Sequence, residues 1–292
     1  MDVKKSEYSI AFMSRLLEVS RQGYYKWVKN KERPYKYEHL LALMKQVLEE
    51  DEENENYGIE RMHEKLLYDH KITESRSTVY RVMRENGLIQ KKKRNPQGLT
   101  QADKNAQKSD NLLKGNFKTD APNKVWVSDI TQLPTADGPL YISGIFDCYD
   151  NSVVGLTMDD NMRKELVITC LEQAMRLHRA RNVIFHSDRG SQYTSGAFRQ
   201  IARQYFIQQS MNSAGGRCHD NAKCESMWAR FKVEKIYDKI DTSKMPMDAV
   251  KQLVFRYFMS YWNNRRICSA NGGFPPAAKR KAYFDSISAK AA

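Results

Sequence analysis

The sequence predicts an α/β protein in which a small all-α region precedes a mixed β-sheet covered by helices. Apolar residues recur at helical spacing up to about residue 94, and residues 95–123 are polar and lack a strong period. Beyond them, β-rich runs alternate with amphipathic helices, which is typical of a layered α/β core. We therefore expect a helical region at 1–94, a basic linker at 95–123, a sheet-containing core at 124–240 and a helical extension of that core at 241–292.

Composition sets limits on the class of protein. The 292 residues are 41% hydrophobic and carry a net charge of +13, which favours polyanionic partners without naming one. Five scattered cysteines, without a recognisable signal peptide, argue against a disulfide framework and fit a reducing cytoplasm. Since no stretch approaches the roughly 20 apolar residues of a membrane helix, we expect no membrane association.

The first segment, "YSIAFMSRLLEVSRQGYYKWVKN", predicts two short helices joined by a tight turn with an N-cap at Ser20. This outline suits a DNA-binding helix-turn-helix and equally an ordinary helical hairpin. The positions that define it are Ile10, Met13, Leu16, Leu17, Tyr24, Tyr25 and Trp27.

A second helical pair follows the acidic run "EEDEENEN", which we interpret as a solvated helix end or loop. Apolar positions from Ile59 to Leu67 and from Val79 to Met83 mark its two helices, and "DHKITESRS" supplies the turn. The later helix and the run behind it present cations to which DNA phosphates would bind, unless they form only a solvated basic face. These candidate DNA-binding residues are Arg76, Arg81, Arg84, Lys91, Lys92, Lys93 and Arg94.

The core begins with three predicted strands, in "KVWVSDITQL", "LYISGIFDCYD" and "NSVVGLTMD", which indicate an antiparallel meander. A helix in "MRKELVITCLEQAMRLHRA", a strand in "NVIFHSD", a helix in "SGAFRQIARQY" and a strand in "FIQQSM" complete the pattern.

Two aspartates interrupt these apolar strands. Asp129 lies within the first strand and Asp188 ends the fourth, and a buried carboxylate is costly unless its charge is compensated. If the two strands are neighbours, the acids lie side by side and need a cation between them. A third acid, Glu225, shares one predicted helix face with Asn221, Trp228 and Lys232, so Glu225 would reach the metal while Lys232 contacts DNA phosphate.

Other residues offer alternative readings. Asp147 and Asp150 are competing acids near a turn, and His186 is either a site residue or a structural histidine. Cys218, His219 and Cys224 match no common zinc pattern. The aromatic residues of "VFRYFMSYWNNRR" indicate core packing, with Arg256, Arg265 and Arg266 as possible flanks for DNA.

Four motifs, "WVSDIT", "HSDRGSQYTS", "SM" followed by "CHDNAKCES", and "YWNNRR" with "GGFPP", together resemble the B-frame (OrfB) transposases of the bacterial insertion-sequence family three. These transposases are relatives of retroviral integrases, in the D,D,E superfamily. The interval from Asp188 to Glu225 is one residue longer than the common family form, and Cys268 stands where the family commonly has a histidine.

The resemblance implies an RNase H-like catalytic core with a triad of Asp129, Asp188 and Glu225 holding two Mg²⁺ ions, for which Mn²⁺ substitutes. It implies cleavage and strand transfer by direct attack of water or a DNA 3′-hydroxyl, without a covalent protein–DNA intermediate. Its partners would be the ends of its own element, target DNA, further copies of the chain and an A-frame protein joined by frameshifting, in the nucleoid of the bacterial cytoplasm. The alternative is a catalytically silent DNA-binding regulator of transposition.

Overall fold

The structure is a computed structural model that describes residues 1–31, 34–89, 109–213 and 221–291. The chain forms two compact units, Met1–Gln46 and Val47–Ala292. The helices of the first 89 residues are α1 (Ile10–Leu16), α2 (Arg21–Lys31), α3 (Glu38–Glu49), the 3-10 turn η2 (Glu52–Asn56), α4 (Ile59–His70) and α5 (Arg76–Glu85). The strands are β1 (Val125–Thr135), β2 (Gly138–Asp147), β3 (Val153–Asp159), β4 (Ile184–Ser187) and β5 (Gln208–Met211). The later helices are α6 (Lys164–His178), α7 (Ser191–Thr194), α8 (Gly196–Gln204), α9 (Ala222–Phe231), the π-helical turns η3 (Lys232–Ile236) and η5 (Arg256–Trp262), α10 (Met247–Phe255) and α11 (Pro276–Ala291).

The smaller unit contains the first helical pair. Ser9 caps α1, and the Ser20 hydroxyl accepts a hydrogen bond from the Gly23 N–H at 2.9 Å, so the predicted cap before the second helix is confirmed. Most apolar side chains of this pair are exposed, including Phe12, Leu16 and Trp27.

The sheet of the larger unit has the strand order β3-β2-β1-β4-β5. The first three strands form the predicted antiparallel meander, while β4 pairs parallel to β1 and β5 pairs parallel to β4. The mixed sheet and its order of elements are therefore confirmed, and they give the core an RNase H-like architecture.

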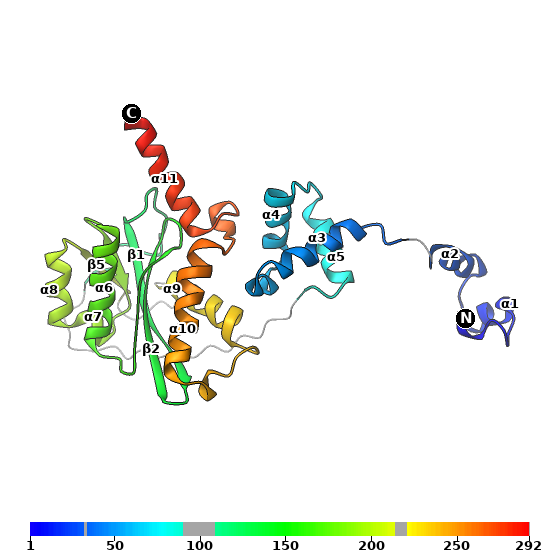
Figure 1. The fold of residues 1–292 in the computed structure, drawn as a ribbon, viewed down its shortest axis with the longest axis horizontal. Coiled ribbons are helices and arrows are strands. Elements are labelled where there is room, and N and C mark those ends of the chain that lie inside the picture. The colour runs from blue at the N-terminus through cyan, green and yellow to red at the C-terminus, as the bar shows by residue number, and fades with distance from the viewer. Residues whose placement is uncertain (32–33, 90–108, 214–220, 292) are drawn as a thin grey trace. The chain divides into compact units, whose positions relative to one another are not determined.

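Helices cover both faces of this sheet (Figure 1). Alternate residues of β1 point to opposite faces, because side chains along a strand have a period of two. Val125, Val127 and Leu133 pack with α9, α10 and η5, whereas Trp126 and Ile130 pack with α6, α7 and α8.

The turn η2 and the helix α4 contact the core through ion pairs and through the rings of Tyr68 and Phe274, whose centroids lie 5.3 Å apart. Lys235 pairs with Glu52 at 3.1 Å and also with Glu53, while the Arg61 guanidinium lies 3.1 Å from a carboxylate oxygen of Glu234. Glu53, Asn54 and Asn56 are buried, so the interpretation of the acidic run as solvated is wrong for these three residues. Lys235, which compensates the charges of Glu52 and Glu53, lies nearly 200 residues further along the chain.

The segment between α5 and β1 packs on the core from residue 109 onward. The Leu112 N–H donates to the Ser210 hydroxyl of β5 at 3.0 Å, and the Leu113 side chain is buried in the core. Residues 95–108 of the expected linker lie outside the described ranges.

The aromatic C-terminal segment packs as predicted at Tyr257, Phe258, Tyr261 and Trp262, which are buried against the sheet. Phe255 is 54% exposed, so the prediction of core packing is wrong for this residue. Arg266 is buried as well and pairs with Glu234, so the alternative in which Arg266 flanks DNA is wrong. Beyond it, α11 leaves the body of the core and ends at the C terminus (Figure 1).

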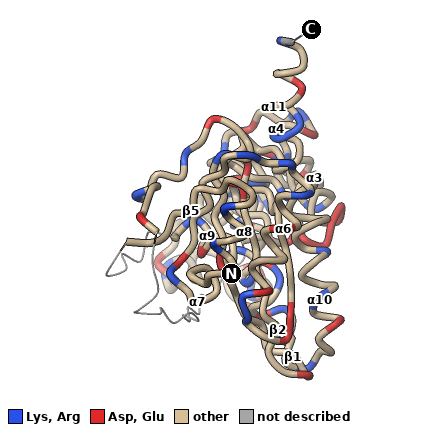
Figure 2. The backbone as a smooth tube through the Cα atoms, turned by 90° about the vertical axis from the view of Figure 1, so that its left-hand side faces the viewer, with Lys and Arg blue, Asp and Glu red and all other residues tan. Residues whose placement is uncertain are grey.

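Basic positions occur on elements throughout the chain, with acidic positions among them (Figure 2). Within the described residues, the helices are too short or too polar to cross a bilayer.

Candidate active site

Asp129 lies in the middle of β1, on the face that α9 covers. Side chains alternate between the two faces of a strand, so Asp129 points to the same face as Val125 and Val127. Those two valines pack in the α9 layer, and Asp129 therefore points toward that layer. The side chain is partly buried. A single carboxylate is thereby placed among apolar neighbours on the sheet.

Asp188 directly follows β4, the parallel neighbour of β1. Val127 pairs with His186 across these strands, so Asp129 and Asp188 each stand two residues beyond the same register pair. Neighbouring strands lie about 4.8 Å apart, which brings the two carboxylates together. The predicted adjacency of the two strands is therefore confirmed.

Glu225 and Lys232 reach this region from the helix above it. Glu225 lies in the first turn of α9, and Lys232 opens the π-helical turn η3 that continues α9. Glu225 is exposed and Lys232 is partly buried. Burial lowers the pKa of Lys232, and the negative charge of Asp129 acts in the opposite direction.

The electrostatics of Asp129 tie these residues together. Burial raises the pKa of Asp129 well above its ordinary range, and the charges of Asp188 and Glu225 raise it further, against a backbone hydrogen bond and Lys232. Repulsion of this kind is what a cation relieves, and carboxylate oxygens are the ligands that Mg²⁺ prefers. Among the residues that the structure describes, however, no three acid, histidine or cysteine side chains converge closely enough to hold a metal unaided.

The loop "HSDRGSQYTS" is fixed around Asp188. One carboxylate oxygen of Asp188 accepts the Gly190 N–H at 2.9 Å, and the buried Tyr193 hydroxyl lies 2.9 Å from that of Ser128, next to Asp129. Sequence reasoning missed this role of Tyr193, although an aromatic residue inside a polar loop is a signal for it. His186 is fully buried and hydrogen-bonds to Ser210 and Asn212, which favours the structural reading.

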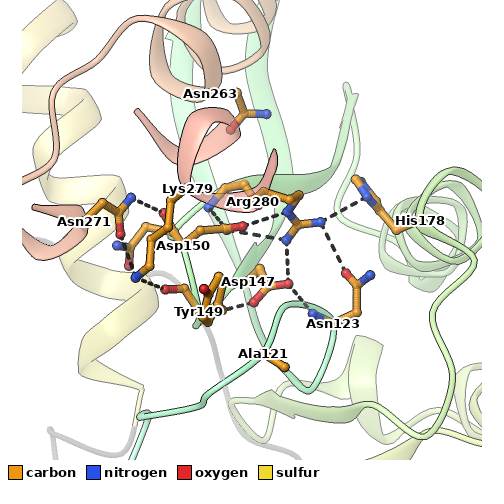
Figure 3. Close-up of polar contacts among 12 residues, drawn as sticks. Ala121, Asn123, Asp147, Tyr149, Asp150, His178, Asn263, Asn271, Lys279 and Arg280 are labelled. Atoms are coloured by element: carbon orange, nitrogen blue, oxygen red, sulfur yellow. Dashed lines mark hydrogen bonds and ion pairs between the residues drawn. The ribbon is translucent and has the colours of Figure 1, made fainter. Parts of the chain in front are cut away.

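The competing acids Asp147 and Asp150 belong to a separate ion-pair network with Arg280 of α11 (Figure 3). The Arg280 guanidinium donates to Asp147 at 2.6 Å and to Asp150 at 2.7 Å, and it lies 3.2 Å from a ring nitrogen of His178. Both carboxylates are fully buried and already compensated by charge, so they are not left to bind a metal.

The candidate DNA-binding helix α5 exposes Arg76, Arg81 and Arg84 and buries Val79, Val82 and Met83. Arg76 pairs with Glu60 of α4, and the Arg84 guanidinium lies over the exposed Tyr80 ring, 5.6 Å from its centroid. Lys91, Lys92, Lys93 and Arg94 lie outside the described residues, as do Cys218 and His219.

Comparisons with known proteins agree with this architecture. Residues 119–216 match the model of the integrase core domain family, and residues 36–96 match an HTH-like domain. A 31 kDa protein of insertion element IS600 from Shigella sonnei is 34% identical over 93% of this chain and 98% of its own. The InsF transposase of insertion sequence IS3A from Escherichia coli K12 is 32% identical over 93% and 94%.

Among solved structures, the HTLV-2 integrase catalytic core domain in complex with magnesium aligns with 56% of this chain and 99% of its own, at 14% identity and a TM-score of 0.40. The full-length likeness to insertion-sequence proteins carries the assignment. This chain belongs to the IS3-family transposases, which are polynucleotidyl transferases of the D,D,E type.

Proposed function

We propose that this chain cuts and joins DNA at a site formed by Asp129, Asp188 and Glu225. The observation that carries the proposal is the shared register of the two aspartates, two residues beyond Val127 and His186, beneath a helix whose glutamate raises the pKa of Asp129. Their oxygens would hold two Mg²⁺ ions, with Mn²⁺ as a substitute. Bound there, the ions supply Lewis acidity to the attacking and leaving oxygens of an in-line displacement.

The protein's own residues then perform distinct tasks. Asp129 on β1 and Asp188 directly after β4 would hold the metal at the sheet, and the exposed Glu225 would complete the set of ligands when DNA is present. Lys232, whose charge Asp129 supports, binds the phosphate backbone next to the scissile bond. Water serves as the nucleophile for cleavage and a DNA 3′-hydroxyl for strand transfer, so no covalent protein–DNA intermediate forms.

We further propose that the exposed arginines of α5, with Lys91, Lys92, Lys93 and Arg94, bind the ends of the element. The active form would be a homo-oligomer on paired DNA ends, joined to an A-frame protein by frameshifting, in the nucleoid of the bacterial cytoplasm. Replacing Arg81 by Ala should weaken binding to all sequences and reduce the slope of log K against log salt by about one.

The deciding experiment is metal-dependent nicking and joining of labelled DNA from the sequence flanking the gene. We expect products with the purified chain in Mg²⁺ or Mn²⁺, and none with Glu225→Gln. Glu165→Gln, an exposed glutamate on α6, is the matched control and should retain activity.

A catalytically silent regulator is the second candidate, because the described acids do not form a closed metal-binding set on their own. If the chain is such a regulator, the parent protein should bind DNA without cleaving it, even after the A-frame protein is added. Cleavage that Glu225→Gln abolishes would exclude it.

A further inference from the structure

Asn221 connects the strand that carries Asp129 to the helix that carries Glu225. Its amide nitrogen donates to the backbone carbonyl of Ser128, the residue before Asp129, at 3.3 Å. Its own backbone carbonyl accepts the N–H of Glu225 at 3.1 Å. One buried residue, 2% exposed, therefore links the residue before Asp129 to Glu225 itself.

The amide oxygen of Asn221 has no hydrogen-bond partner among the described residues. Its identity as the oxygen is fixed, since the other end of the amide meets a carbonyl and only a nitrogen donates to a carbonyl. An orphaned amide oxygen in a buried place destabilises the folded protein, so its persistence calls for an explanation.

Capping does not supply the explanation. Asn221 is the residue that precedes the first turn of α9, where asparagine usually accepts a backbone N–H with its side-chain oxygen. Here that side chain makes no capping hydrogen bond. Its oxygen is free at the position one helical turn before Glu225, on the same helix face.

We propose that the Asn221 amide oxygen belongs to the coordination shell of the divalent cation held by Asp129 and Glu225. A neutral amide oxygen is a suitable Mg²⁺ ligand, and it adds a donor without adding to the repulsion that already raises the pKa of Asp129. The Ser128 link makes Asn221 a positioning residue as well, because it holds the start of α9 against β1. This inference rests on the proposed function of the site.

Calorimetric titration of the full chain with Mn²⁺, without DNA, tests the proposal. Asn221→Leu keeps the approximate shape and removes the oxygen, and we expect it to raise the Kd for Mn²⁺ at least about tenfold. Asn221→Asp keeps an oxygen and loses the nitrogen, and it should bind Mn²⁺ at least as tightly as the parent. Thermal unfolding in EDTA shows whether each variant is folded.

Two results would overturn the proposal. Parent affinity in Asn221→Leu would leave the oxygen without a role, and equal weakening of both variants would assign the effect to the Ser128 link alone. If Asn221→Leu does not fold, the Asn221→Asp titration decides, since weakened binding there contradicts the oxygen's role. Failure of the proposed function gives a different result. In that case the parent does not bind Mn²⁺, or Asp129→Asn binds Mn²⁺ as tightly as the parent does.

Discussion

Glu234 and Arg266 form a buried bidentate ion pair, with Nη2 2.7 Å from Oε1 and Nε 3.0 Å from Oε2. Burial opposes the charge of Glu234, but Arg266, together with Arg61 of α4 and the Tyr257 hydroxyl, lowers the pKa of Glu234 to about 2. Since Glu234 lies in the turn that continues α9, this pair joins the second helical pair, α9 and the C-terminal segment.

Breaking this pair on one side should destabilise the larger unit strongly. Arg266→Met leaves Glu234 with only part of its compensation, and we expect a loss of about 3–5 kcal/mol in the free energy of unfolding. The double variant Glu234→Gln with Arg266→Met should lose less than the sum of the two single variants. Urea unfolding followed by tryptophan fluorescence measures both, and strict additivity would show that the pair is not coupled.

Neutralising Asp129 should stabilise the metal-free protein while abolishing DNA cleavage. Asp129→Asn removes a charge that burial and Asp188 disfavour, so the free energy of unfolding in EDTA should rise by about 1 kcal/mol or more. Asp248→Asn, at an exposed site, is the matched control and should change stability by less than about 0.5 kcal/mol. A less stable Asp129→Asn protein would argue against repulsion between the acids.

Arg280 should be essential for anchoring α11 to the core (Figure 3). Arg280→Leu leaves the fully buried carboxylates of Asp147 and Asp150 without their cation, which should cost about 3–5 kcal/mol. The neighbouring Lys281 is exposed and pairs with the exposed Asp285, so Lys281→Leu should be nearly neutral. Chemical denaturation of the three proteins makes the comparison, and equal stability of the two variants would refute the anchoring role.

His178 should make the stability of the core depend on pH. Burial, reinforced by the charge of Arg280, lowers the pKa of His178 to about 4, against about 6.5 in an unfolded chain. Above pH 6.5 both states are neutral, and between pH 6.5 and 4 only the unfolded state takes up the proton. Stability is therefore lost as the pH falls through this window, by roughly 1–3 kcal/mol.

A comparison of the parent with His178→Gln isolates the contribution of His178 to the pH dependence of stability. The comparison is needed because other groups titrate in the same pH window. The difference in unfolding free energy between the parent and His178→Gln should shrink steadily from pH 7 to pH 4.5. His39→Gln, an exposed histidine of the smaller unit, should follow the parent. A pH-independent difference would mean that folding does not change the pKa of His178.

Gly144 should tolerate no side chain. A Cβ atom there would lie 2.8 Å from the Trp228 ring, which is buried in α9 one turn after Glu225. Gly144→Ala should cost about 1–3 kcal/mol and reduce cleavage by displacing the helix. Gly196→Ala, where no atom lies within 4 Å, is the control and should leave both properties unchanged. Thermal unfolding and the cleavage assay measure the two properties. A Gly144→Ala protein with the stability and activity of the parent would contradict the close packing.

The sequence by itself determined the order and type of the elements in the core. Hydrophobic period separates strands from helices locally. The sequence left open whether β1 and β4 are neighbours, and the structure shows that they pair in parallel although Val125 and Ile184 are far apart in the chain. The candidate acids Asp129 and Asp188 were predictable from the local pattern as well, since a carboxylate in an apolar strand is unusual at its own position.

Only the tertiary structure decided how the remaining charges are compensated. The acidic run before α4 has no local feature that separates Glu53, which is buried against Lys235, from its solvated neighbours. Likewise, nothing near Asp147 or Asp150 indicates Arg280, which is more than 100 residues away. Pairing energies depend on distance and burial in space, and these quantities exist only once the chain has folded.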